Sequence, residues 1–361
     1  MDNLTHSLVG ALIGQAGLKR RTGLAMPALI VGANLPDVDA ACFLWLDGVQ
    51  HLAFRRGITH GPIAWVVLPL MLAGLLYAFD RWQGKRGTRP EGRLPVRFGW
   101  LYGLSFLACL THPALDWLNS YGIRLLEPFS SRWFYGDVLF IIDVWLWALL
   151  GFATRLSLRR ERRDGEWRRP ARVAIAVTLV YIGTNAAISA FAEDKAAALV
   201  RHGYGLDPTL VVASPKPFAW WERELLWRWQ ESDVVRVAAI YGIGGFSIFG
   251  KIYLEDQGYD VRSPAITFDR PARPDGWMNT SAFLVSQFRL DDWKRCEPEL
   301  DAFLFWSRMP IVIEGNEFKP TVVMDQRFLD PRARDRFSVA LPDVRCEPIP
   351  TPAHAEEAGR P

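Results

Sequence analysis

The chain of 361 residues is long enough for two domains of roughly 150 residues each. Its 16 Trp and 21 Phe exclude a disordered chain, and its four Cys are too few for a disulfide-dense scaffold. The net charge of +3 joins a basic half, residues 1–192 at +8, to an acidic half, residues 193–361 at −5.

Six apolar segments in the basic half predict an α-helical membrane bundle. The two longest are Ile58–Phe79, whose one ionisable group is His60, and Val173–Ala192, which carries no charge. At 1.5 Å per residue both can cross a hydrocarbon core of about 30 Å, which disfavours buried helices of a soluble protein. Four shorter segments complete the bundle, the last two as half-crossing or re-entrant helices: Phe98–Leu115, Val138–Thr154, Ser7–Leu18 and Thr22–Leu35.

The basic residues predict how this bundle is oriented. Arg81–Arg97 contains six Lys and Arg residues and Arg155–Arg172 contains eight, whereas Pro113–Gly136 contains two. By the positive-inside rule the two basic loops face the cytoplasm, and the helix Val173–Ala192 carries everything after it to the outer side. The first apolar segment lacks the basic lead of a signal peptide, so we expect it to belong to the mature bundle.

The acidic half predicts a soluble, β-rich α+β domain over residues 193–347, followed by a disordered tail over 348–361. Helices are expected near 200–225 and 291–306. Cys296 and Cys346 are the only Cys of this half, and their spacing leaves open whether they pair or stay reduced. Turn signals separate the predicted strands, which are Leu210–Ala213, Val234–Ile240, Phe246–Leu254, Ala282–Phe288, Pro310–Ile313 and Thr321–Met324.

Ionisable residues recur at the ends of the apolar segments. A central Asp in a membrane helix costs about 2.5–3.5 kcal/mol, so such residues are functional candidates. The predicted topology brings all of them to the outer side, although the loop charges that orient the chain do not include them. The set comprises His6, Asp37, Asp39, His60, His112, Asp116, Asp137 and Asp143.

Three His and several carboxylates on one side predict a site for one or two divalent metal ions. Zinc binds His nitrogen and carboxylate oxygen and is the first expectation, with manganese and magnesium as alternatives. Each residue alone is explained more simply, as a helix cap or a buried polar side chain, but their convergence favours a metal. The predicted ligands are His6, Asp37, Asp39, His60, His112 and Asp116.

Five motifs in this order resemble the YdjM-like family of inner-membrane metal-dependent hydrolases. The resemblance covers about residues 1–150 and implies a multi-pass protein of the bacterial inner membrane with a periplasmic C-terminal domain. The six predicted ligands occupy the family's characteristic positions, but many members have His where this chain has Arg55. The motifs are DNLTHSLVG, NLPDVD, FRRGITHG, THPALDWLNSYG and PFSSRWFYGDVLFIID.

We therefore expect a membrane-bound hydrolase in which metal-activated water attacks an ester. A site at the membrane surface favours an amphiphilic or lipid substrate, and Arg beside a metal favours a phosphate ester. Asp39 or Asp116 is the expected general base, and Arg56 the expected anion-binding residue. The alternative is a non-enzymatic metal-binding sensor, transporter or scaffold. Nucleic acid is not an expected partner, because the basic residues lie in short loops, and the oligomeric state is not predicted.

Overall fold

The computed structural model describes residues 1–230, 238–249, 251–254, 283–286, 290, 293–295, 297–313, 320–328 and 336–341. The chain divides into two compact units. The first comprises Met1–Trp45, Phe54–Trp227 and Ile243–Glu255, and the second comprises Leu46–Ala53, Arg228–Gly242 and Asp256–Pro361. Cys296, Cys346 and the tail 348–361 lie outside the described residues, so their pairing and disorder stay predictions.

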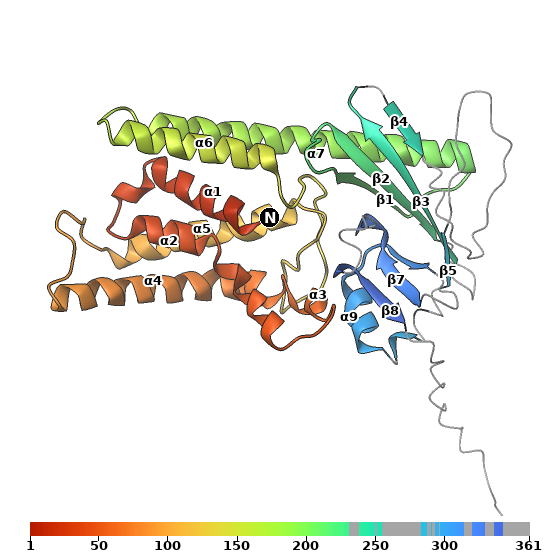
Figure 1. Ribbon diagram of the computed structural model, residues 1–361, viewed down its shortest axis with the longest axis horizontal. Coiled ribbons are helices and arrows are strands. Elements are labelled where there is room, and N and C mark those ends of the chain that lie inside the picture. The colour runs from red at the N-terminus through yellow and green to blue at the C-terminus, as the bar shows by residue number, and fades with distance from the viewer. Residues whose placement is uncertain are drawn as a thin grey trace, which may run out of the picture. The chain divides into compact units, whose positions relative to one another are not determined.

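Each of the six predicted apolar segments overlaps an α-helix of the first unit (Figure 1). Among the described residues, two helices, α4 and α7, are long and apolar enough to cross a membrane. A third candidate span is the pair formed by α2 and the 3-10 helix η2 (Leu35–Leu44), which is bent by 51°. Membrane crossing by the other helices stays a prediction. The six helices are α1 (Asn3–Gln15), α2 (Ala25–Gly32), α4 (Pro62–Lys85), α5 (Phe98–Trp117), α6 (Val144–Glu161) and α7 (Arg168–Tyr204).

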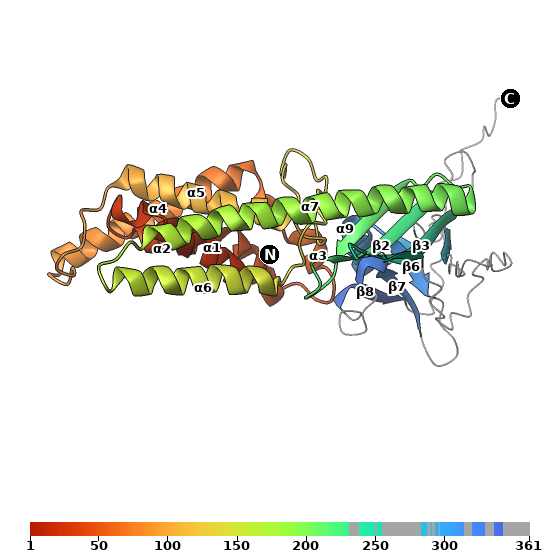
Figure 2. The ribbon, with the colours of Figure 1, turned by 90° about the horizontal axis from the view of Figure 1, so that it is seen from above.

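The helices of the first unit pack side by side in the order α4, α5, α2, α1, α6 and α7 (Figures 1 and 2). Small residues allow the close approaches. A Cβ added to Gly10 of α1 would lie 2.5 Å from the carbonyl oxygen of Leu29 in α2, so only glycine fits there. One face of α4 is apolar and exposed, from Ile63 through Leu70 to Leu75, as expected for a surface that faces lipid rather than water.

Helix α7 continues past Ala192, and a β-sheet packs against its second half. Buried Ala192 and Ala196 contact Ala213, Leu225 and Phe246 of this sheet. Its strands are hydrogen-bonded in the order β1 (Leu210–Pro215), β2 (Glu222–Gln230), β3 (Ala238–Ser247) and β4 (Lys251–Leu254). Strand β4 runs antiparallel to the end of β3, and β5 (Phe283–Ser286) runs antiparallel to its beginning.

The second unit contains a three-stranded antiparallel sheet. Its strands are β6 (Pro310–Ile313), β7 (Thr321–Asp325) and β8 (Ser338–Leu341), with β7 in the centre. Helix α9 (Pro298–Trp306) precedes the sheet, and Leu300, Phe303 and Trp306 form its buried face. This helix confirms part of the helix expected near 291–306.

Two predictions for the C-terminal half are wrong. The helix expected near 200–225 is present only as far as Tyr204, where α7 ends, and the rest of that range contains β1 and the start of β2. Gly205 adopts a left-handed φ of 69°, which stops the helix, and Pro208 and Pro215 prevent it from resuming. The strand predicted over Phe246–Leu254 is a hairpin in which Ser247 pairs with Lys251. Strands β2 and β8 were not predicted, because β2 has no simple alternation of polar and apolar residues.

Asp325, at the end of β7, is a buried carboxylate whose charge is compensated within the second unit. It accepts hydrogen bonds from the Arg327 guanidinium at 2.8 Å and from the Ser307 hydroxyl at 2.6 Å. Burial alone would raise the pKa of Asp325, but the Arg327 guanidinium and these hydrogen bonds lower it to about 2. Because an unfolded Asp titrates near about 3.9, this group stabilises the fold above about pH 4, and its contribution is lost as the pH falls toward 2.

We expect the Asp325 carboxylate to contribute about 2 kcal/mol to the free energy of unfolding at neutral pH and almost nothing near pH 2. Wild-type protein should therefore lose more stability than Asp325→Asn between about pH 5 and about pH 2. Denaturant unfolding followed by near-ultraviolet circular dichroism measures this difference. Asp301→Asn, which changes an exposed carboxylate of α9, should keep the wild-type pH dependence. An unchanged pH dependence in Asp325→Asn would contradict the assignment.

Candidate metal centre

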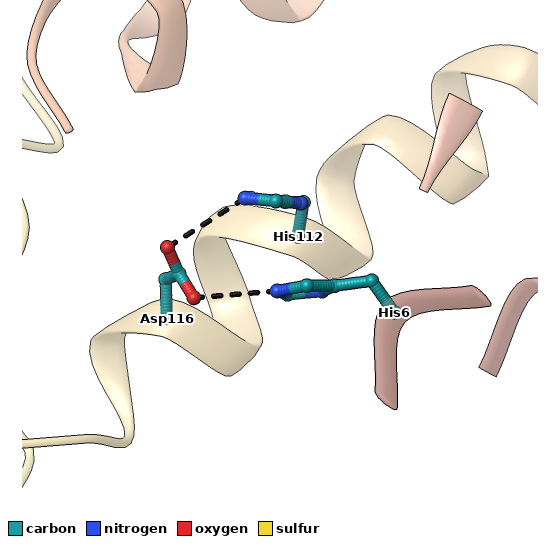
Figure 3. Close-up of side chains that lie close together, drawn as sticks. All are labelled: His6, His112 and Asp116. Carbon is teal, nitrogen blue, oxygen red and sulfur yellow. Dashed lines mark ion pairs between the residues drawn. The ribbon is translucent and has the colours of Figure 1, made fainter. Parts of the chain in front are cut away.

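Five ionisable side chains of the first unit converge at one end of the helical bundle. His6 lies near the start of α1, Asp37 lies in η2, and His60 ends the 3-10 helix η3 (Ile58–His60) just before α4. His112 and Asp116 lie one turn apart on the same face of α5. Figure 3 shows His6 and His112 pointing at different oxygens of the Asp116 carboxylate. The five residues thus come from four segments that are far apart in the sequence.

Local sequence positions these side chains. Asp2 caps α1, and its carboxylate accepts hydrogen bonds from the backbone N–H groups of Leu4 and Thr5. This cap fixes the first turn of the helix, from which His6 projects. Pro36 lies at the start of η2, where its fixed φ and missing N–H suit the first turn of a helix, and Asp37 follows it.

Asp116 lies at the centre of the cluster. Its Oδ1 is 3.3 Å from His6 Nε2, and its Oδ2 is 3.6 Å from Nε2 of both His60 and His112. Asp37 Oδ1 lies 3.8 Å from His112 Nε2. Neighbouring ligands of one tetrahedral zinc ion are about 3.3 Å apart at bond lengths of about 2.0–2.1 Å, so the two atoms of each of these pairs are close enough to share an ion. The ligand atoms fall into two overlapping triads, each within 4.8 Å, which are His6–His112–Asp116 and Asp37–His60–His112.

The three imidazoles present nitrogen atoms that lack hydrogen-bond partners among the described residues. These buried atoms are Nε2 of His6, His60 and His112. An unsatisfied buried polar atom costs about 1–3 kcal/mol, so proteins rarely leave three together. His112 Nδ1 lies 2.7 Å from the carbonyl oxygen of Ala33, which places its proton on Nδ1 and directs the Nε2 lone pair at the carboxylates. The residues present therefore fit a divalent cation such as zinc.

Asp39 lies beside His60 and belongs to neither triad. Its Oδ2 accepts hydrogen bonds from the Arg56 backbone N–H at 2.8 Å and the Thr59 hydroxyl at 3.1 Å. The same oxygen lies 3.5 Å from His60 Nδ1, the ring nitrogen opposite the one that faces Asp116. Such a carboxylate orients a metal-binding His and raises its basicity. The geometry thus favours an orienting role for Asp39 over direct coordination.

Asp39→Asn tests this role of the carboxylate. We expect metal affinity to fall about 10–100-fold, the range typical of a partner that orients a ligand. Competition with a chelator of known affinity measures the change in purified protein. Asp47→Asn, an exposed carboxylate change in the following loop, should leave the affinity unchanged. Complete loss of the metal from Asp39→Asn would instead indicate direct coordination.

Arg56 holds Asp116 in place. Its Nε lies 3.0 Å from Asp116 Oδ2, while Nη1 donates to Asn119 Oδ1 at 3.0 Å and to the carbonyl oxygen of Gly122 at 3.2 Å. The guanidinium also stacks over the Tyr121 ring at 4.4 Å. Burial raises the pKa of Tyr121 to about 12, so this phenol is neutral at physiological pH. Arg56 adopts a left-handed φ of 54°, a strained conformation that often marks functional sites.

Arg55 is the more accessible of the two arginines, with 23% of its side chain exposed against 5% for Arg56. Its Nη2 lies 3.1 Å from Asp37 Oδ1 and its Nε lies 3.5 Å from Asp39 Oδ1. Burial opposes the charge, but the Asp39 and Asp37 carboxylates outweigh it and raise the pKa of Arg55. The Met1 amino group also forms an ion pair with Asp116 Oδ1. The space around the three carboxylates therefore accommodates several positive charges.

The structure does not bring every predicted ionisable residue into the cluster. Asp143 caps α6 by accepting hydrogen bonds from two backbone N–H groups, and it accepts a third from the Tyr181 hydroxyl at 2.9 Å. The backbone carbonyl of Asp137 accepts a hydrogen bond from Ser189. Sequence reasoning missed Asn119 and Tyr121, although both follow Asp116 closely in the motif that carried the resemblance.

Comparison with known proteins agrees with the resemblance in the motifs. The sequence model of the YdjM inner membrane protein family matches residues 1–192. The uncharacterized protein YfhP of Bacillus subtilis strain 168 is 30% identical to this chain over 141 residues. That alignment covers 37% of this chain and 39% of YfhP, so the two are similar over well under half of their lengths. No solved structure matches the chain.

Proposed function

This chain belongs to the YdjM inner membrane protein family, and on that basis we propose that it is a membrane-bound metal-dependent hydrolase. The observation that carries the proposal is the convergence of three imidazole Nε2 atoms, none of which forms a hydrogen bond to a described residue, on the Asp116 carboxylate. We further propose a multi-pass arrangement in the inner membrane, with the cluster and the C-terminal half on the outer side. The basic loops and the two long apolar helices support this arrangement.

Three His and two carboxylates would hold the ion. Asp116 would bind through the oxygens that face the rings, and Asp37 would complete the set through Oδ1. We propose zinc first, with manganese or magnesium as alternatives, and one or two ions per chain, because the ligand atoms form two overlapping triads. A bound ion would lower the pKa of a coordinated water to about 7 and polarise the scissile ester.

The exposure of the three carboxylates supports a proposal for their roles in proton transfer. The Asp37 side chain is 11% exposed, whereas the side chains of Asp39 and Asp116 are 2% and 1% exposed. Within the described residues Asp37 Oδ2 forms no hydrogen bond, so we assign the general base to Asp37. The hydrogen bonds of Asp39 and Asp116 favour positioning and ligand roles over the base role expected from the sequence.

The side chains exposed on η2, on η3 and at Arg55 support a proposal for the substrate class. Arg55 presents an accessible guanidinium beside it, which suits a phosphate oxygen better than the enclosed Arg56 does. Val38 and Ile58 are about half exposed, and Leu44 is 87% exposed. A positive group next to exposed apolar side chains favours a phosphate ester of a lipid or another amphiphile.

A hydrolysis assay on purified protein tests the proposal. Protein loaded with zinc, manganese or magnesium should release phosphate or alcohol from a short-chain phosphatidic acid or a lipid diphosphate presented in mixed micelles. Chelation should stop the reaction, and returning the metal should restore it. If the protein binds the metal but hydrolyses neither substrate class, the result would favour the non-enzymatic sensor. A sensor needs the metal but no turnover.

A further inference from the structure

A groove of about 570 Å³ runs along α6, away from the metal centre. Leu8 of α1 lines one side, and the other is formed by a single face of α6 that begins at Gly151 and ends at Arg162. The lining residues of α6 recur at alternating steps of three and one, the spacing of one helical face. The volume lies within the range of about 300–1,000 Å³ typical of small-molecule sites.

The groove is apolar at one end and strongly basic at the other. Leu8 and Gly151 line the apolar end, and Arg155, Arg159 and Arg162 line the basic end. At 1.5 Å per residue, Gly151 and Arg162 are about 16 Å apart along the helix. Only Gly151 and Thr154 of the α6 lining belong to the predicted apolar segment, and Arg155 to Arg162 belong to the loop predicted to face the cytoplasm. The groove therefore crosses the boundary between the hydrocarbon core and the headgroup region of that leaflet.

The polar groups of the groove have no protein partners within the described part of the chain. Arg155, Arg159 and Arg162 are exposed and form no ion pair there, and Glu161 beside them pairs with Lys19 instead. The Thr154 hydroxyl is buried and makes no hydrogen bond to any described residue. Three unpaired guanidinium groups thus border one side of the same apolar surface.

We propose that this groove binds an anionic phospholipid of the leaflet that the basic loops face. Its phosphodiester lies among the three arginines, whose guanidinium groups bind phosphate oxygens bidentately. The first part of an acyl chain lies along Leu158, Gly151 and Leu8. Basic sites between membrane helices on the cytoplasmic side recognise anionic headgroups in this way.

This site is independent of the proposed hydrolase, because none of the residues that line the groove belongs to the candidate metal centre. The positive-inside rule explains why this loop is basic, but it does not explain why three of its arginines share one groove face with Leu8 and Leu158. Arg160 and Arg163 belong to the same basic segment and do not line the groove. They supply a control with the same change in net charge.

The test is native mass spectrometry of the full-length protein in detergent with equal amounts of phosphatidylglycerol and phosphatidylcholine of matched acyl chains. Wild-type protein should retain phosphatidylglycerol in preference to phosphatidylcholine. Arg155→Gln/Arg159→Gln should lower that preference about 25-fold, at about fivefold for each arginine. Arg160→Gln/Arg163→Gln should keep it.

Arg155→Lys/Arg159→Lys guards against a change in folding or topology, because it keeps the charge and removes only the bidentate fork. We expect its preference for phosphatidylglycerol to fall severalfold while its thermal midpoint without lipid stays at the wild-type value. Equal retention of both lipids by wild-type protein would overturn the proposal. So would an unchanged preference in Arg155→Gln/Arg159→Gln, or an equal loss in Arg160→Gln/Arg163→Gln.

Discussion

Replacing His112 with alanine should remove the bound metal from the purified protein and abolish the proposed hydrolysis. His112 belongs to both ligand triads, and its ring stacks on that of His6 with centroids 3.8 Å apart. The substitution therefore deletes one ligand and loosens a second. We expect the loss of metal affinity to exceed the 10–100-fold typical of a residue that only orients a ligand. Elemental analysis of the metal content, beside the assay of ester hydrolysis, measures both effects.

His202→Ala is the matched control, because it removes an exposed His near the end of α7. It should keep the wild-type metal content and activity. Circular dichroism and size-exclusion chromatography should show that both variants remain folded and inserted in micelles. If His112→Ala protein keeps its full metal content, the cluster around Asp116 is not the metal centre, and the hydrolase proposal loses its main physical support.

The helices of the bundle could be predicted from the sequence because apolar length is a local property. Each apolar segment overlaps a helix, but the residues at which the helix begins and ends depend on packing and on helix caps. Helix α7 extends to Tyr204 because its second half, past Ala192, buries small residues against β1 and β2. A contact with strands later in the chain leaves no signal in a hydrophobicity pattern. The same reason explains why residues 200–225 were predicted to be helical.

The side chains that gather around Asp116 could be predicted from the sequence, whereas the role of each could not. Buried His and Asp residues are costly in a membrane, so their recurrence at helix ends marks His6, His60, His112 and Asp116 without any structure. Asp37 and Asp39 are two residues apart in η2, and a 3-10 helix turns about 240° over two residues. One carboxylate thus turns toward His112 while the other turns behind His60, a difference that sequence spacing alone does not specify.

Arg56→Gln should lower the free energy of unfolding by about 3–5 kcal/mol in the metal-free protein, the cost of breaking a buried ion pair. The substitution leaves Asp116 buried without its guanidinium and removes the hydrogen bonds to Asn119 and Gly122. Denaturant unfolding in detergent, followed by tryptophan fluorescence, measures the loss. Arg132→Gln, an exposed substitution in the loop after α5, should change the stability by less than about 0.5 kcal/mol.

Two further measurements separate the backbone, the charge and the metal at position 56. Arg56→Gly removes the same side chain but relieves the left-handed φ, so it should be about 1 kcal/mol more stable than Arg56→Gln. Saturating zinc should restore part of the stability of both variants, because a bound cation compensates the Asp116 carboxylate that Arg56 no longer neutralises. Wild-type stability of Arg56→Gln without zinc would show that Asp116 does not depend on Arg56. A loss that zinc leaves unchanged would show that the ion does not bind beside this carboxylate.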